Sequence, residues 1–241
     1  MSSIAIIPAR GGSKRIARKN LKPFDGVPML ARSIDKALGS GLFQRVVVST
    51  DDPEIAELAI ACGAEVPFVR PQALADDFTG TAAVIVHALQ ALRELGQQFE
   101  YACCIYATAP LLQLRFLRQG LALLEQHQDR SFAFSVCSFG FPVQRALTLD
   151  EQGALGALYP EFSQARSQDL PVAYQDAAQF YWGRSQAWLE GEALFSSRSL
   201  PVILPRHLVQ DIDTDEDWRR AQYLYAALKA CLLYTSPSPR D

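Results

Sequence analysis

The sequence lacks the features of several common protein classes. Its 241 residues carry a net charge of −3, which provides no general attraction for nucleic acid or for an anionic membrane. No apolar stretch approaches the roughly 20 residues of a membrane span, and the start, MSSIAII, lacks the charged and long apolar regions of a signal peptide. We therefore expect a cytoplasmic protein that binds neither nucleic acid nor membrane.

Cysteine and histidine are too sparse or too poorly spaced for the sites they usually build. The five cysteines are odd in number, and no pair has C-x-x-C spacing, which argues against a disulfide framework or a zinc site. Several lie in apolar runs, where cysteine packs as a small hydrophobic residue. Of the histidines, His87 lies in a helical pattern and His127 near a helix end, so the sequence identifies no general base.

Two common nucleotide-binding motifs are also absent, the P-loop G-x-x-x-x-G-K-[ST] and the dinucleotide fingerprint G-x-G-x-x-G. Instead, an apolar run at 4–7 ends at Pro8 and opens into a loop with Gly11 and Gly12. Backbone N–H groups in such a loop can approach phosphate oxygens, and nearby cations neutralise the charge. A solvated basic turn is the alternative. Because the loop follows the first expected strand directly, we favour a nucleotide site. The loop carries five cations: Arg10, Lys14, Arg15, Arg18 and Lys19.

Strand-like and helix-like segments alternate along the chain. This order predicts an α/β, Rossmann-like fold, with a mostly parallel sheet flanked by helices. Ligands of such sheets bind at the carboxyl ends of the strands, where the loop at 8–20 is expected. Strands are expected at 4–7, 45–49, 65–69, 101–106, 131–136 and 201–204, and helices at 28–38, 53–62, 79–95, 111–127 and 214–230.

The chain is expected to form one domain over residues 1–230. Prolines and glycines break the pattern at about 139–188, which predicts a small inserted subdomain for sugar contacts or a dimer interface. From residue 231 to 241, serine and proline replace helical periodicity. We expect this tail to be disordered and of non-native origin, because its composition cannot bury a core.

Two aspartates near the C-terminus form a second candidate site. If the segment 209–213 is extended, Asp211 and Asp213 project on the same face. Neighbouring carboxylates repel unless a cation lies between them, and Mg²⁺ binds one or two carboxylates together with phosphate oxygens. The alternative is helix capping by Thr214, with acidic residues opposing the dipole in the first turn. We assign capping to Thr214 and 215–217, and Mg²⁺ to the two aspartates.

The loop IIPARGGSKRIARKN resembles the signature loop of the sugar nucleotidyltransferases. More narrowly, it is similar to the cytidylyltransferases that activate nine-carbon ulosonic acids, sialic acid and its relatives, as CMP-sugars. The stretch DIDT matches the metal-binding aspartates of that family, and the similarity covers roughly residues 3–229. The resemblance implies the nucleotide-diphospho-sugar transferase fold, CTP and an ulosonic acid as substrates, Mg²⁺ as cofactor, and a homodimer whose insertion reaches the partner's active site.

The resemblance also implies roles for individual residues of the nucleotide half. Arg10 and Lys14 would hold the triphosphate during catalysis, and Ser13 with the backbone of 11–12 would cradle it. The remaining nucleotide-binding residues implied by the resemblance are Asn20, Arg70 and Thr81.

The acceptor half departs from the sialic acid enzymes. Tyr106 replaces a glutamine associated with sugar binding, whereas Gln175 and Ala177 replace an arginine and an asparagine. Arg166 matches a sugar-contacting arginine that can meet a carboxylate in a bidentate fork; a solvated loop is the alternative for its segment. The stretches CCIYATAP and ARSQDLP, and Tyr174 with QFYWG, are more similar to the family members that act on pseudaminic acid, a 5,7-diacetamido ulosonic acid.

The expected reaction is attack of the anomeric hydroxyl on the α-phosphorus of CTP, with release of pyrophosphate. Two alternatives stay open at this point. One is a cytidylyltransferase for sialic acid or another ulosonate, and the other is a nucleotide-binding module without catalytic activity.

Overall fold

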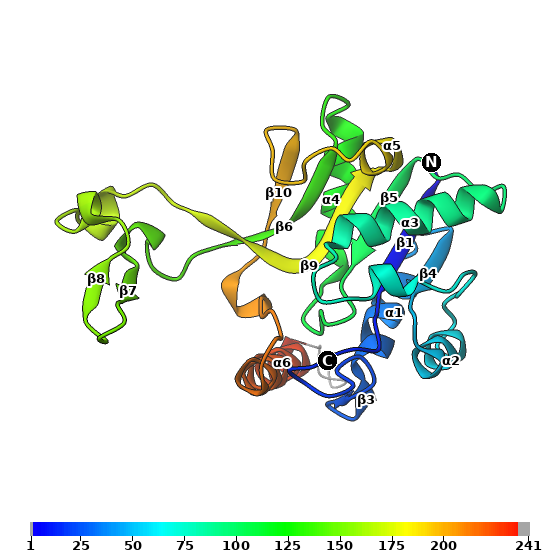
Figure 1. Cartoon of the computed structure of the whole chain (residues 1–241), viewed down its shortest axis with the longest axis horizontal. Coiled ribbons are helices and arrows are strands. Elements are labelled where there is room, and N and C mark those ends of the chain that lie inside the picture. Colours follow the sequence, from blue (N-terminus) through cyan, green and yellow to red (C-terminus); the bar gives the residue numbers. More distant parts are fainter. Residues whose placement is uncertain (1, 236–241) are drawn as a thin grey trace, which may run out of the picture.

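A six-stranded sheet forms the centre of the molecule in the computed structural model, which describes residues 2–235 (Figure 1). The strand order is β10-β6-β9-β5-β1-β4. β1 pairs in parallel with β4 and β5, and β10 pairs in parallel with β6, while β9 runs antiparallel between β5 and β6. The expected α/β fold with a mostly parallel sheet is confirmed. The strands are β1 (Ser3–Pro8), β4 (Arg45–Ser49), β5 (Tyr101–Ile105), β6 (Phe132–Ser138), β9 (Tyr174–Arg184) and β10 (Ser199–Ile203).

Helices cover both faces of this sheet. α1 (Met29–Gly39), α2 (Pro53–Ala61) and α4 (Leu114–Gln126) lie on one face, and α3 (Thr81–Glu94) and α5 (Ser185–Leu189) on the other. Short 3-10 turns link several elements: Gln72–Leu74, Val143–Arg145, Pro160–Phe162, Ser167–Asp169 and Arg206–Leu208.

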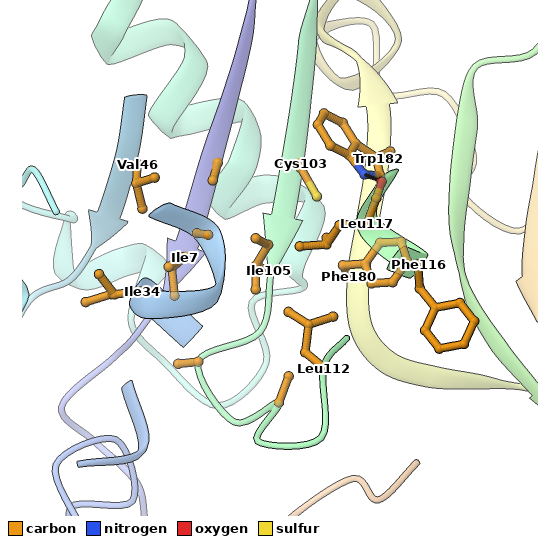
Figure 2. Close-up of a cluster of buried hydrophobic side chains, with 14 of the residues drawn as sticks. Ile7, Ile34, Val46, Cys103, Ile105, Leu112, Phe116, Leu117, Phe180 and Trp182 are labelled. Atoms are coloured by element: carbon orange, nitrogen blue, oxygen red, sulfur yellow. Dashed lines mark hydrogen bonds between the residues drawn. The ribbon is translucent and has the colours of Figure 1, made fainter. Parts of the chain in front are cut away.

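Successive side chains of β1 point to opposite faces of the sheet, and both faces are buried, so almost all residues of β1 are apolar. Ile7 packs with Ile34 of α1 on one face, whereas Ile4 and Ile6 pack with Ile85 of α3 on the other. A strand buried on both faces reads as a continuous apolar run, because neither set of side chains meets water. Figure 2 shows the first of these faces, where Ile7, Ile34, Ile105, Leu117 and Trp182 gather.

Side chains cap the starts of two expected helices, and the cap at Thr214 is the one predicted from the sequence. Asp52 accepts a hydrogen bond from Ile55 N at 3.1 Å at the start of α2, with Pro53 in the first turn. At α6 (Asp215–Thr235), Asp217 N donates to Thr214 Oγ1 at 3.2 Å and Thr214 N donates to Asp217 Oδ2 at 2.9 Å. These reciprocal bonds satisfy amide groups that have no partner within the helix.

Two expected elements differ from the structure, the strand at 65–69 and the tail from residue 231. The strand expected at 65–69 is reduced to one bridge between Val47 and Glu65, because Pro67 has no N–H to donate to a ladder. The segment 209–213, considered above as an extended stretch, does not join the sheet. The tail expected from 231 is helical as far as Thr235, since leucine and tyrosine in this stretch are compatible with continuation of α6. Residues 236–241 lie outside the described residues.

Residues 139–173 project from the body as an arm, at the left of Figure 1. The arm contains a separate hairpin of β7 (Leu147–Leu149) and β8 (Leu155–Ala157), in which every residue is exposed. The insertion is therefore shorter than the expected 139–188, because residues 174–188 form β9 and α5 of the body. A second small hairpin, β2 (Pro23–Phe24) with β3 (Val27–Pro28), precedes α1.

None of the helices in residues 2–235 combines the length and the apolar character that crossing a membrane requires.

Gly120 is expected to tolerate no side chain. A Cβ added there would lie 2.6 Å from Trp182 Cδ1, and Trp182 Nε1 donates to Leu117 O at 2.9 Å, which prevents the ring from moving freely. Overpacking costs about 1–3 kcal/mol and helix propensity returns at most about 1 kcal/mol. Gly120→Ala should therefore lower the free energy of unfolding by about 1–2 kcal/mol in urea denaturation. The matched variant Gly39→Ala, with open space around the added Cβ, should be neutral or stabilising. Equal stability of both variants would contradict this packing argument.

Candidate active site

A cavity of about 310 Å³ opens where β1 and β5 end and the basic loop begins. This is the edge of the sheet at which ligands of α/β proteins bind. The cavity is formed by the loop at 8–20, the segment 70–84 and residues 106–108. Most of the residues predicted from the sequence line it together: Arg10, Ser13, Lys14, Asn20, Arg70, Thr81, Tyr106 and Asp213.

Gly11 lies where the basic loop contacts the start of α2. Its N–H donates to Asp51 Oδ1 at 3.0 Å, and a Cβ added there would lie 2.5 Å from Asp52 Oδ2. Any side chain would therefore push the basic loop away from the start of α2. Gly12 lies in more open space, with Arg10 Nη1 at 4.0 Å from its added Cβ. The N–H of Gly11 is therefore bonded to Asp51, within the protein.

Arg10 and Lys14 converge on one carboxylate, that of Asp77. Arg10 Nη1 lies 2.6 Å from Asp77 Oδ1, and Lys14 Nζ pairs with Asp77 Oδ2. Lys14 and then Arg10 hold the pKa of Asp77 below its usual value. The two cations therefore already bind an anionic group at the mouth of the cavity. Sequence reasoning missed Asp77, because nothing in its local pattern indicates a partner more than sixty residues away.

Arg15 and Lys19 tie the other end of the basic loop to Asp213. Arg15 Nη2 lies 2.9 Å and Lys19 Nζ 3.5 Å from Asp213 Oδ1, and Lys19 also donates to Ile212 O. Ile212 is fully buried and packs with Ile16 of the loop. The sequence grouped Arg15 and Lys19 with the basic loop but gave them no separate role. In the structure they join the loop to the segment that carries both aspartates.

Asp211 and Asp213 flank the buried Ile212 and border a second, neighbouring cavity of about 390 Å³. Desolvation raises the pKa of Asp211, and the negative charge of Asp213 adds to the rise. Across residues 2–235, no group of three or more His, Cys, Asp or Glu side chains is arranged to hold a metal ion. The carboxylates of Asp211 and Asp213 are two neighbouring oxygen ligands. Such a pair fits an ion such as Mg²⁺, which takes its remaining ligands from phosphate oxygens and water.

Arg70 is a buried cation at the wall of the first cavity. Only 4% of its surface is exposed, and its guanidinium donates to Ser49, from Nε to Oγ at 3.1 Å and from Nη2 to the backbone oxygen. Burial lowers its pKa to about 10, so the group stays charged at neutral pH. Among the ion pairs of the described residues, none includes Arg70. A desolvated cation without a carboxylate partner favours an anionic ligand.

Three further predicted residues form the floor and side of the cavity. Asn20 is buried, and its Nδ2 donates to Arg10 O at 3.0 Å, which fixes the backbone next to the key arginine. Thr81 Oγ1 and the Tyr106 hydroxyl lie 2.9 Å apart, at the start of α3 and just beyond the end of β5. These groups add neutral hydrogen-bonding capacity to a cavity whose other polar groups are mostly charged.

The two other residues predicted to contact the acceptor lie outside the first cavity. Arg166 belongs to the arm, where its Nε lies 2.6 Å from Asp169 Oδ2 and its side chain is exposed. Gln175 borders the second cavity with Asp211, and its Nε2 lies 3.4 Å from Cys137 Sγ. A single chain therefore assembles the cationic half of the predicted site and leaves Arg166 apart from it.

Comparison with known proteins agrees with this geometry. Residues 4–225 match the cytidylyltransferase family. The pseudaminic acid cytidylyltransferase of Campylobacter jejuni subsp. jejuni is 45% identical over 225 residues, which are 93% of this chain and 97% of that protein. A CMP-N,N'-diacetyllegionaminic acid synthase of Legionella pneumophila is 28% identical over 232 residues, covering 93% of this chain and 96% of the relative.

A solved structure of CMP:2-keto-3-deoxy-manno-octonic acid synthetase complexed with CTP has a similar fold. Its TM-score is 0.68 at 16% sequence identity, with 95% of this chain and 100% of that chain covered. The family match spans nearly the whole chain and includes both the basic loop and the paired aspartates. On this match and on the 45% identity to a named enzyme, the chain belongs to the cytidylyltransferase family.

Proposed function

We propose that the protein transfers CMP from CTP to the anomeric hydroxyl of pseudaminic acid and releases pyrophosphate. The observation that carries the nucleotide half is the convergence of Arg10, Lys14 and the buried Arg70 on one cavity. The acceptor is supported by the 45% identity to an enzyme named for pseudaminic acid. The buried thiols of Cys103 and Cys104 are compatible with the reducing cytoplasm as its location.

In this reaction the sugar oxygen forms a bond to the α-phosphorus as the bond to pyrophosphate breaks. Negative charge then grows on the phosphate and leaving oxygens, so positioning and electrostatic stabilisation dominate catalysis. Arg10 and Lys14 would bind the triphosphate in place of Asp77, and Arg70 would add a desolvated charge. Asp211 and Asp213 would hold Mg²⁺, which when bound would neutralise charge on the phosphate oxygens.

The acceptor is tested by pyrophosphate release from CTP and Mg²⁺ with three sugars in parallel. These are pseudaminic acid, N-acetylneuraminic acid and 3-deoxy-manno-octulosonate. Release with pseudaminic acid at the highest kcat/KM is expected. A higher value with another sugar would replace the acceptor and keep the reaction, whereas release with none would contradict the proposed transfer.

Asp77 competes with the nucleotide, because it occupies the two cations that the triphosphate needs. Asp77→Asn removes the competing charge and keeps the side-chain shape. The variant is therefore expected to lower the Kd for CTP by about 3- to 10-fold, measured by titration calorimetry. Asp129→Asn, an exposed aspartate paired with its neighbour Arg130, is the control and should leave the Kd unchanged. Weaker CTP binding by Asp77→Asn would mean that the carboxylate supports the site.

The arm supports a homodimer as the working form. Leu149 and Leu155 of its hairpin are 69% and 70% exposed, and Phe141 at its base is 87% exposed. Apolar side chains gathered on a projecting hairpin are typical of an interface. In such a dimer the arm would cover the partner, and Arg166 would reach the partner's acceptor site.

A double variant Leu149→Asp with Leu155→Asp is expected to convert the dimer to a monomer, because two buried charges would be left unpaired. Light scattering after gel filtration measures this change. Val69→Asp, an exposed apolar residue outside the arm, is the matched control. A double variant with unchanged mass would place the interface elsewhere.

A further inference from the structure

The second cavity, which adjoins the first at Asp213, combines several carboxylates with one cation. Its walls come from the start of β9, the segment 209–213 and the first turns of α6. Four aspartates contribute negative charge, and among the described residues that line the cavity Arg220 is the single cation. A ligand in this cavity would lie next to the space in which the triphosphate is expected.

Three of the four carboxylates already have partners elsewhere in the protein. Asp176 accepts one hydrogen bond on each oxygen, from a backbone N–H at 2.9 Å and from a tyrosine hydroxyl at 2.6 Å. Asp217 accepts from Thr214 N at 2.9 Å, from the Thr214 hydroxyl at 2.8 Å and from a glutamine amide at 2.9 Å. Asp213 pairs with two cations of the basic loop. Groups other than Arg220 therefore hold these three carboxylates.

Arg220 itself has no carboxylate partner. It lies on α6 one turn after Asp217, yet its guanidinium forms no ion pair with that residue or with any other between residues 2 and 235. A guanidinium carries its N–H donors in a planar fork that fits a carboxylate. Arg220 therefore contributes an unpaired positive charge to a cavity whose carboxylates are mostly engaged.

An acceptor for the proposed reaction brings a negative charge of its own. In an ulosonic acid, the carboxylate and the anomeric hydroxyl are bound to the same carbon. Attack on the α-phosphorus places that hydroxyl beside the triphosphate, and the carboxylate comes with it to the junction of the two cavities. There it approaches Asp211 and Asp213, and like charges at short distance repel. A positive charge in the second cavity is therefore needed to bind this substrate.

We propose that Arg220 binds the carboxylate of the acceptor in the second cavity and thereby makes the protein select an ulosonic acid over an uncharged sugar. The inference rests on the proposed function. Gln175, which the sequence associates with the acceptor, borders the same cavity. Arg166, the other arginine considered for the acceptor, lies on the arm and is already paired with Asp169 at 2.6 Å. A single chain thus supplies a cation for the sugar acid without the arm.

Arg220→Gln tests this contact, because it removes the charge and keeps a polar side chain. The measured quantity is the ratio of kcat/KM for pseudaminic acid to kcat/KM for its C1 methyl ester, in which the carboxylate is uncharged. The variant should lower this ratio by about 10- to 100-fold, because only the acid loses charge-assisted hydrogen bonds. The KM for CTP should keep its wild-type value.

A merely structural role of Arg220 would give a different result. Distortion of α6 would displace the paired aspartates, so the rates with acid and ester would fall together and their ratio would stay unchanged. Arg220→Lys provides a second variant, which keeps the charge and loses the planar fork. It should recover part of the preference for the acid that Arg220→Gln loses. Thermal unfolding of each variant confirms that the protein remains folded.

Arg219→Gln is the matched control, because it removes the same charge from the neighbouring position of α6. Arg219 is exposed, its Nε donates to Asp215 O at 3.3 Å, and it does not belong to the lining of the second cavity. The ratio of acid to ester should keep its wild-type value in this control. A fall equal to that of Arg220→Gln would mean that the net charge of α6, and not a contact with the substrate, sets the preference.

A ratio within about twofold of wild type in folded Arg220→Gln would overturn the proposal. If Arg166→Gln lowered the ratio in its place, the arm would supply the partner of the carboxylate, and Arg220 would have no part in binding it.

Calorimetric binding to the full chain keeps this test separate from that of the proposed function. Pseudaminic acid, N-acetylneuraminic acid, 3-deoxy-manno-octulosonate and their methyl esters are titrated with Mg²⁺ and a CTP analogue that cannot release pyrophosphate. If the wild-type protein bound an acid but turned over none, weaker binding of that acid by Arg220→Gln would support the inference. The failed turnover would then count only against the proposed reaction. Equal binding of acid and ester by the wild-type protein, or binding of no acid, would overturn the inference.

Discussion

Lys14→Ala is expected to lower kcat/KM for CTP by about 10²- to 10³-fold while the protein stays folded. The Lys14 side chain is 80% exposed, and Asp77 is the partner that the structure gives it. An exposed ion pair contributes little to stability, so the loss should fall on catalysis and nucleotide binding. Asp77 would still be held by Arg10 at 2.6 Å, so the surrounding loop should keep its position.

The measurement is pyrophosphate release under initial-rate conditions, together with thermal unfolding of each variant. Lys36→Ala is the control, because Lys36 lies in the last turn of α1 and its loss tests the general effect of removing one positive charge. Arg10→Ala should lower the rate at least as much, since it removes both the ion pair and the hydrogen bond to Asp76 O. Rates within about threefold of wild type would exclude the loop as the triphosphate site.

The central sheet was predictable because strands that are buried on both faces are recognisable in the sequence as continuous apolar runs. β1 and β5 are continuous apolar runs, and their bounds agree closely with the expected strands. The start of α6 was equally predictable, since Thr214 and Asp217 form a local capping pair. The strand expected at 65–69 was wrong because an apolar run was given more weight than Pro67, which removes a ladder hydrogen bond.

The cationic half of the site was also predictable, because its residues lie close together in the sequence. Arg10, Ser13 and Lys14 lie on one loop directly after β1, so their convergence follows from chain connectivity. Asp77 was not predictable, because it meets its partners only through tertiary folding. Asp77 reaches Arg10 across 67 positions. This contact leaves no pattern in the surrounding sequence.

Asp213→Asn is expected to raise the Mg²⁺ concentration for half-maximal activity by about 10-fold or more and to lower kcat. An amide oxygen is a weaker ligand for a hard cation than a carboxylate oxygen, and one negative charge is lost from a two-carboxylate site. Asp211→Asn should act in the same direction, because burial and Asp213 already raise the pKa of Asp211 and a cation would relieve that repulsion. Titration of initial rates with Mg²⁺ measures both variants.

Asp213 also pairs with Arg15 and Lys19, so its substitution changes the loop as well as the metal site. Arg15→Ala separates the two effects, because it breaks the 2.9 Å ion pair and leaves both carboxylates in place. Asp215→Asn is a control for charge alone, since Asp215 lies in the first turn of α6, beyond the paired aspartates. One outcome would assign Asp213 to anchoring the loop. In that outcome, Arg15→Ala shifts the Mg²⁺ titration as much as Asp213→Asn does, while Asp211→Asn leaves the titration unchanged. If only the two aspartate variants shifted the titration, the pair would act as the metal site, because ion-pair loss alone would then not explain the change.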